Sequence, residues 1–303
     1  MAFTAFAIGT AKEQAPRRRS RIALFLLLPG LLYLALFFLV PLVSLTMTSL
    51  QTPLVGGDVG QYQNALNWQN YAAVLDAYGE HFLRSFLYAL LATVFALLFS
   101  YPLAYFIGVT ARRWPLIQHL LLVMVIAPFF ISFLLRTLAW KAMFSDESFV
   151  VTSLKALSML APDAHITGTP VAVVFGLTYN FIPFMTLPIY ASLERLDIRY
   201  LEAGNDLYAS AFTTFRTVTI PLSMPGIVSG VLLTFIPAAG DYVNASQNFL
   251  GGSSSQMVGN AIESNFLVIN NYPAAAAMSI ILMAAILVMV IAYVKRSGTE
   301  DLL

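Results

Sequence analysis

Long apolar stretches dominate the pattern of hydrophobic and polar positions along this chain. Six of them reach the length of about 20 residues that a helix needs to cross a bilayer. The first follows four arginines but is too long for the apolar part of a secretory signal peptide, so we expect it to stay in place as a helix. The pattern therefore predicts six transmembrane helices, at 22–50, 82–109, 116–138, 171–193, 220–240 and 273–294.

The composition indicates the same class of protein. Hydrophobic residues occupy 59% of the 303 positions, charged residues only 10%, and the mean hydropathy is +0.77. Soluble domains carry about 25% charged residues, and a chain so poor in charge cannot cover a water-facing surface. We expect an all-α polytopic membrane protein with a tail at 1–21, one six-helix transmembrane domain at 22–297 and a second tail at 298–303. The net charge of +1 gives no sign of nucleic-acid binding.

The basic residues predict how the chain is oriented. Of the 16 Lys and Arg residues, 12 lie in the two tails and in the segments after the second and fourth apolar stretches. Cytoplasmic loops carry an excess of Lys and Arg. Both termini and the loop at 194–220 are therefore expected in the cytoplasm. The loops at 51–81, 140–169 and 241–272 are expected outside, in a bacterial plasma (inner) membrane.

Proline interrupts several of the predicted helices, at Pro128, Pro183, Pro188 and Pro237. Each is either a harmless kink or a break beside a transport path, where freed backbone groups find water or protein partners.

The chain has none of the sequence signatures of an enzyme. It contains no Gly-Lys pair, hence no phosphate-cradling loop, and no cysteine for thiolate chemistry. His81, His119 and His165 are too scattered to suggest a zinc site. We expect no catalytic residue, no metal and no cofactor bound by this chain.

One polar stretch, RYLEAGNDLYASAFTTFRTVTIP, follows the fourth apolar segment. Glu202 and Asp206 fall one helical turn apart, on one face. Leu201, Tyr208 and Phe212 can form an apolar stripe, so we expect one amphipathic helix around 202–211. Membrane-surface helices are usually basic, and this acidic face therefore favours a protein partner.

The same stretch resembles the EAA loop of permeases of binding-protein-dependent ATP-binding cassette (ABC) importers, which reads E-A-A, three residues, G, nine residues, then I-x-L-P. Glu202, Ala203 and Pro221 match this pattern, whereas Gly204 and Tyr208 depart from it, with a bulky ring where the family has glycine. The resemblance implies a fold like that of type I ABC importer permeases. It also implies a coupling helix that docks on the ATPase through Glu202, Ala203, Gly204, Asp206, Tyr208, Ala209, Ser210 and Pro221.

A second stretch, GDYVNASQNFLGGSSSQMVGN, resembles the spermidine/putrescine permeases within that family. The resemblance implies a polyamine substrate and four kinds of partner: a second, distinct permease, two ATPase subunits that bind ATP and Mg²⁺, an extracytoplasmic binding protein and the lipid membrane. Relatives with other small substrates (iron, organic acids, amino-acid-like solutes) leave these alternatives open. An ion-gradient-driven secondary transporter is less favoured, because few ionisable residues lie deep in the six segments.

Candidate residues of the substrate path lie near the outer ends of the fourth and fifth segments. A polyamine needs a carboxylate to offset its charge and aromatic faces for cation–π contact. Asp241 and Tyr242 could supply both, with Tyr179 and Asn180 as further candidates on the same wall. Alternatively, Asp241 caps a turn through backbone hydrogen bonds.

Overall fold

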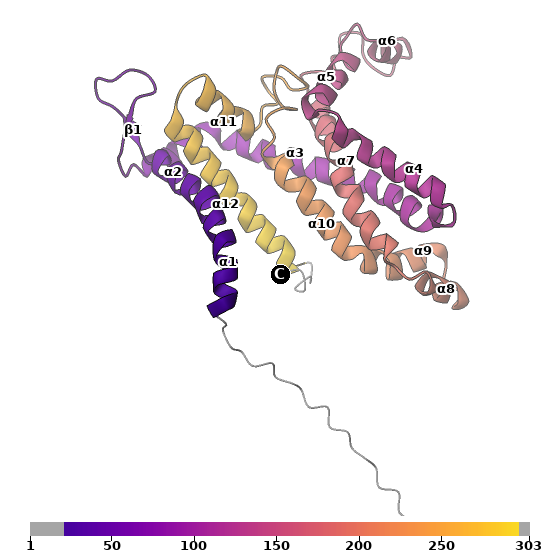
Figure 1. The fold of residues 1–303 in the computed structure, drawn as a ribbon. Helices are drawn as coiled ribbons and strands as arrows, with labels where there is room; N and C mark the ends of the chain where they lie inside the picture. Colours follow the sequence, from indigo (N-terminus) through magenta and orange to yellow (C-terminus); the bar gives the residue numbers. More distant parts are fainter. Residues whose placement is uncertain (1–20, 297–303) are drawn as a thin grey trace, which may run out of the picture. The chain divides into compact units, whose positions relative to one another are not determined.

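The computed structural model describes residues 21–296, so the two predicted tails lie outside the described residues except for Arg21 (Figure 1). The chain divides after Leu45 into two units. The first contains α1 (Arg21–Leu34), a π-helical turn (Ala35–Leu39) and the start of α2 (Val40–Ser49). The apolar window of the span Leu26–Ser49 has no buried side chain. Such a helix needs lipid or another apolar surface around it.

The second unit begins with a short antiparallel pair, β1 (Thr52–Pro53) and β2 (Tyr62–Gln63), before the long helix α3 (Gln69–Tyr105). The prediction that this helix starts at 82, after a loop at 51–81, is wrong. Val74 in the second turn, with Tyr71 and Tyr78 beside it, packs in one apolar cluster with Val258 and Met278. This packing extends the helix outward, past the point where continuous hydrophobicity begins.

The third predicted segment is broken rather than straight. It contains α4 (Pro115–Ile126), a 3-10 turn (Ala127–Phe130) and α5 (Phe133–Met143), which bend by 95° at the break. Pro128 has no backbone N–H for a helical hydrogen bond, and Ile131 is extended. The described residues thus hold five helices long and apolar enough to cross a membrane, or six if the bent pair is one span.

The core of this unit forms where α7 (Pro170–Glu194) packs against both α3 and α10 (Ile220–Ala239). Ala89 and Ala92 of α3 meet Val173 and Leu177 of α7 in a cluster of small and branched side chains. The remaining helices are α6 (Phe149–Ala156), α8 (Arg199–Asp206), α9 (Ala211–Thr214), α11 (Val258–Leu267) and α12 (Tyr272–Arg296).

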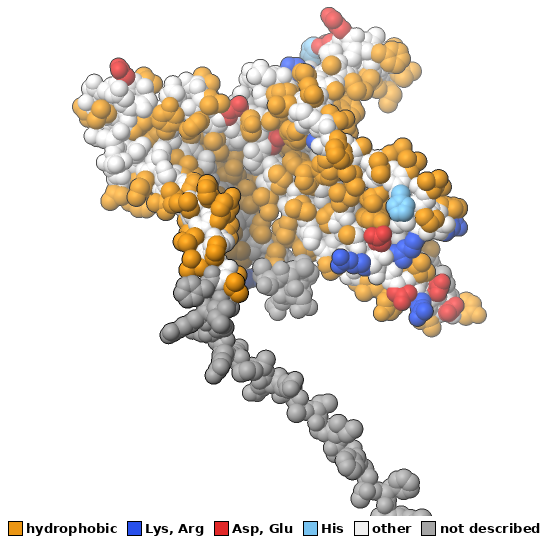
Figure 2. Space-filling view, viewed as in Figure 1, with side chains coloured by type: hydrophobic (Ala, Val, Ile, Leu, Met, Phe, Trp, Pro, Cys, Tyr) orange, Lys and Arg blue, Asp and Glu red, His pale blue; other side chains and the backbone are white. Residues whose placement is uncertain are grey.

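Apolar side chains cover most of the surface that Figure 2 shows, and charged side chains gather at the end that carries α8 and α9. Helices α8 and α9 precede α10, whereas the loop with Asp241 follows it. The two candidate sites therefore lie at opposite ends of α10, separated by the length of this 20-residue helix.

Candidate functional site

The stretch with the EAA-like pattern forms two short helices. Helix α8 starts behind Asp197, whose carboxylate accepts a hydrogen bond from the Arg199 backbone N–H at 3.0 Å. Glu202 and Asp206 are both exposed and lie one turn apart. Among the other predicted coupling residues, Ala203, Ser210 and Pro221 are exposed, and Gly204 and Ala209 are half-buried. The two exposed carboxylates outnumber the one exposed arginine of α8, Arg199, so this helix is net acidic and suits a basic partner.

The predicted single helix around 202–211, with an apolar stripe from Leu201 to Phe212, is wrong. Helix α8 ends at Asp206, and Tyr208 adopts a positive φ of +57°. The backbone N–H of Ala209 closes the end by donating to the Gly204 carbonyl at 3.0 Å, the bond that typifies a Schellman cap. Ser210 then starts α9 by accepting from the Thr213 N–H at 3.2 Å. Tyr208 therefore lies after the end of α8 and Phe212 lies in α9, so the two side chains do not form one stripe on a single helix.

The structure explains the first departure from the EAA pattern, Gly204, but not the second, Tyr208. A Cβ at Gly204 would lie 2.7 Å from the hydroxyl oxygen of Thr214, so the missing side chain lets α8 lie directly on α9. Tyr208 stands in the left-handed conformation that favours glycine, the residue the family has there. Its ring is 98% exposed and so gains no packing in return.

Replacing Tyr208 with glycine is expected to stabilise the end of α8. A left-handed conformation costs a side-chain-bearing residue about 1–2 kcal/mol, partly offset by the greater chain entropy of glycine. Amide hydrogen exchange at 203–209 should slow by a few-fold in Tyr208→Gly. The control is Tyr200→Gly, at an exposed position inside the helix, where exchange should become faster. Faster exchange in Tyr208→Gly would show that the left-handed backbone conformation of Tyr208 does not destabilise the end of α8.

At the other end of α10, Asp241 lies buried in a turn. Its carboxylate accepts hydrogen bonds from the backbone N–H of Asn244 at 2.8 Å and from the Asn244 side-chain amide at 3.1 Å. Burial raises the pKa of Asp241 to about 6, although these hydrogen bonds and those from the backbones of Val243 and Ala245 oppose the rise. The carboxylate therefore has the capping geometry considered as the alternative for this residue.

Asn244 joins this turn to two helices. Its side-chain oxygen accepts from the Asn180 amide of α7 at 3.1 Å, and that amide also donates to the Thr137 hydroxyl of α5 at 3.2 Å. Asp241 and Asn180 thus belong to one buried network, connected through Asn244. The carbonyl oxygen of the Asn180 side chain is buried and has no partner among residues 21–296, which leaves one acceptor for a donor from outside the chain.

The two tyrosines predicted for the path lie apart from this network. Tyr179 packs edge-on against Trp140 at 5.1 Å between ring centres. Tyr242 is half exposed, and its backbone carbonyl accepts from the Asn260 side chain at 2.6 Å. Although Tyr179 precedes Asn180 in α7, consecutive helix residues do not face each other, so neither predicted tyrosine joins the network.

Sequence reasoning missed Asn244, Thr137 and Arg136. The spacing of Asp241 and Asn244, three residues apart after a helix end, was the available signal for a capping turn. Arg136 is buried beside Thr137, with its Nε and Nη1 unpartnered among the described residues. Its guanidinium lies 5.7 Å from the centre of the Phe133 ring. A buried cation thus lies next in the chain to Thr137, a member of the polar network.

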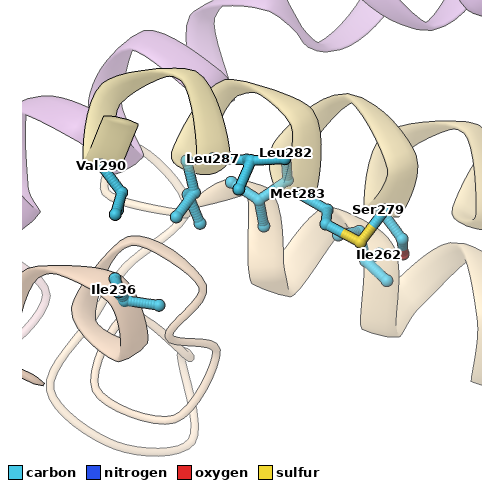
Figure 3. Close-up of a pocket in the computed structure, with 8 residues that line it drawn as sticks. Ile236, Ile262, Ser279, Leu282, Met283, Leu287 and Val290 are labelled. Carbon is cyan, nitrogen blue, oxygen red and sulfur yellow. The ribbon is translucent and has the colours of Figure 1, made fainter. Parts of the chain in front are cut away.

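A groove of ≈ 410 Å³ between α10, α11 and α12 is apolar by contrast (Figure 3). Ile236, Ile262 and the α12 side chains from Leu282 to Val290 line it. Its one polar side chain, Ser279, is directed to the Ala275 carbonyl at 2.9 Å. The groove offers nothing to a charged solute and suits an acyl chain or another helix.

A bundle of broken and continuous spans, with an acidic capped helix at one end and a buried polar network at the other, defines a membrane transport component. Residues 100–295 match the family described as binding-protein-dependent transport system inner membrane component, and the chain belongs to that family. It is the permease subunit of an ABC importer, not an enzyme, and the predicted fold class is confirmed.

Several known proteins resemble most of the chain. It is 36% identical over 266 residues to the spermidine/putrescine transport system permease protein PotB of Salmonella typhimurium strain SL1344, covering 88% of this chain and 90% of that protein. PotB of Escherichia coli strain K12 is 35% identical over 88% of this chain and 94% of its own length. A bacterial ABC transporter that imports the acidic polysaccharide alginate has a chain of the same fold, with a TM-score of 0.67 at 15% identity over 93% and 96% of the two chains.

Proposed function

We propose that this permease subunit forms part of the translocation path for a polyamine such as spermidine or putrescine. The observation that carries the proposal is the 35–36% identity to two PotB proteins over 88% of the chain. The buried side-chain oxygen of Asn180, which has no partner among residues 21–296, supports it, because an ammonium group can donate a hydrogen bond to it.

A substrate with a carboxylate is the second candidate. The Nε and Nη1 atoms of Arg136, which have no partner among the described residues, favour it, because a buried cation without a counter-ion is costly and a passing anion would relieve that cost. Uptake into proteoliposomes that contain the complete importer distinguishes the two. We expect labelled spermidine or putrescine to accumulate with ATP and the loaded binding protein, and excess amino acid or dicarboxylate not to compete. Accumulation of a labelled amino acid or dicarboxylate without accumulation of the polyamine would exclude the polyamine proposal.

We infer the partners from the family description and from the exposed acidic helix. Two ATPase subunits bind ATP and Mg²⁺ and receive α8 of each permease, a second and distinct permease completes the path, and an extracytoplasmic binding protein delivers the solute. The free carboxylates of Glu202 and Asp206 support docking of α8. The loops around β1–β2, α6 and 241–257 form the opposite end, which we assign to the binding protein.

We propose that both termini and α8 face the cytoplasm, since the basic residues gather on that side. The chain has no cysteine, so single cysteines report topology cleanly. Cysteines at the exposed positions Asp58 and Ser254 should react with a membrane-impermeant maleimide in intact cells. A cysteine at the exposed Leu207 should react only after the membrane is opened. The reverse labelling pattern would show that the chain has the opposite orientation in the membrane.

A further inference from the structure

Two helical turns continue α3, a π-helical turn (Phe106–Thr110) and a 3-10 turn (Ala111–Arg113). One side chain of the second turn, Arg112, fastens them to the end of α7. Arg112 donates four hydrogen bonds to backbone carbonyls: Nε to Gly108 at 2.9 Å, Nη1 to Leu196 at 3.1 Å, and Nη2 to Leu193 at 2.8 Å and to Glu194 at 2.6 Å. Three of these acceptors are on the last residues of α7 or just beyond it.

This arrangement satisfies a general need of helix ends. The last carbonyls of a helix have no partner within the helix, and a cation there also interacts favourably with the helix dipole. Hydrogen bonds from a charged donor are shorter and stronger than neutral ones. Arg112 therefore holds the end of α7 firmly, four residues before α8 begins at Arg199.

Two further contacts make the same end rigid. A Cβ on Gly108 would lie 3.2 Å from the Cβ of Leu193, so the two backbones approach closely. The Tyr190 hydroxyl donates to Glu194 at 2.7 Å and accepts from Gln118 of α4 at 3.4 Å. The ends of α3, α4 and α7 thus form one block, from which α8 projects.

We propose that Arg112 is a positioning residue for energy coupling, because it makes this block move as one body when the ATPase moves α8. The proposal rests on the proposed function of α8. Rigid-body motion of packed elements is one way in which such switches work. Arg112 holds the last two carbonyls of α7, at Leu193 and Glu194, and one carbonyl of the link to α8, at Leu196. Without these hydrogen bonds, α8 can follow the ATPase while α3 and α7 stay behind.

The matched test compares Arg112→Ala with Arg113→Ala in the complete importer. Both remove one positive charge from the same turn, but Arg113 is exposed and lies on the Trp114 ring at 4.0 Å. We expect Arg112→Ala to lower substrate uptake per ATP hydrolysed by about tenfold, within the usual range for coupling between sites. Assembly and ATP hydrolysis should persist. Arg113→Ala should leave the ratio unchanged, and Arg112→Lys, which cannot span four carbonyls, should resemble Arg112→Ala.

A disulfide offers a rescue that a purely structural or charge effect would not show. Gly108→Cys and Leu193→Cys place two Cβ atoms near the 3.5–4.5 Å typical of a disulfide. In the Arg112→Ala background, oxidation should restore uptake per ATP and reduction should remove it again. The same cysteine pair with Arg112 intact is the control for the substitutions themselves.

The outcomes separate this proposal from the function on which it rests. If Arg112→Ala couples normally, or if it and Arg113→Ala lose coupling equally, the positioning role falls while the importer assignment stands. If the disulfide forms and coupling does not return, the mechanical account is wrong. If the unmodified complex shows no ATP-driven uptake of a polyamine, the proposed substrate falls independently of the clamp.

Discussion

Reversing the charge of Glu202 is expected to release the ATPase from the permease. In Glu202→Lys the exposed carboxylate in the first turn of α8 becomes an ammonium group, one turn from Asp206. A like-charge contact across an interface costs several kcal/mol, which is enough to dissociate a moderately stable complex. The helix itself should persist, since its caps at Asp197 and Ala209 do not involve the Glu202 side chain.

The measurement is the yield of ATPase subunits that co-purify with a tagged permease, together with ATP-driven uptake. Glu202→Gln should show a partial loss. Asp58→Lys makes the same charge reversal at an exposed site in the loop between β1 and β2, at the opposite end from α8, and should leave the yield of co-purified ATPase unchanged. Normal assembly and uptake in Glu202→Lys would remove α8 from the ATPase interface.

Most of the membrane bundle could be predicted from the sequence because hydrophobic length alone defines a span. The segment 171–193, for example, differs from α7 (Pro170–Glu194) by one residue at each end. Charged or polar residues border that run on both sides. The fold class follows from such runs without any knowledge of packing.

Boundaries set by packing or local geometry could not be predicted this way. The first turns of α3 are stabilised by contacts with α11 and α12, which the residues 69–81 do not reveal. The 95° bend before α5 depends on an extended residue after Pro128, a position that many helices accommodate as a kink. Helix α8 ends early because Ser210 caps the next helix, although Leu207 to Phe212 have ordinary helical composition.

The candidate path shows the same division. A carboxylate followed by an aromatic residue is compatible with cation binding and with a capped turn, and composition cannot tell which way the oxygens point. The structure directs both oxygens of Asp241 to Asn244. The effect of Asp241 on a substrate would then be transmitted through Asn244 to Asn180, rather than made by contact.

Asp241→Asn is expected to lower uptake of a cationic substrate by about tenfold while the complex still assembles and hydrolyses ATP. An amide in place of the carboxylate puts an NH₂ group against the N–H donors of Asn244, and a buried polar group left unpaired costs about 1–3 kcal/mol. Asn244 must then turn, which breaks its acceptor bond with Asn180. Asn180→Ala should lower uptake similarly, and the double variant should lose little more than either alone, because both changes break one network.

The ionisation of Asp241 gives an independent measurement. Its pKa rises from 3.8 to about 6 on burial. The folded state therefore binds more protons than the unfolded state between these two values, so stability falls as pH rises through that window. The thermal midpoint of the unmodified protein should decrease from pH 4 to pH 6 more steeply than that of Asp241→Asn, which has no proton to lose. Asp163→Asn, at an exposed site, should keep the steeper slope. Equal slopes in the unmodified protein and Asp241→Asn would show that the ionisation of Asp241 does not affect stability. Unchanged uptake in Asp241→Asn would remove this carboxylate from the path.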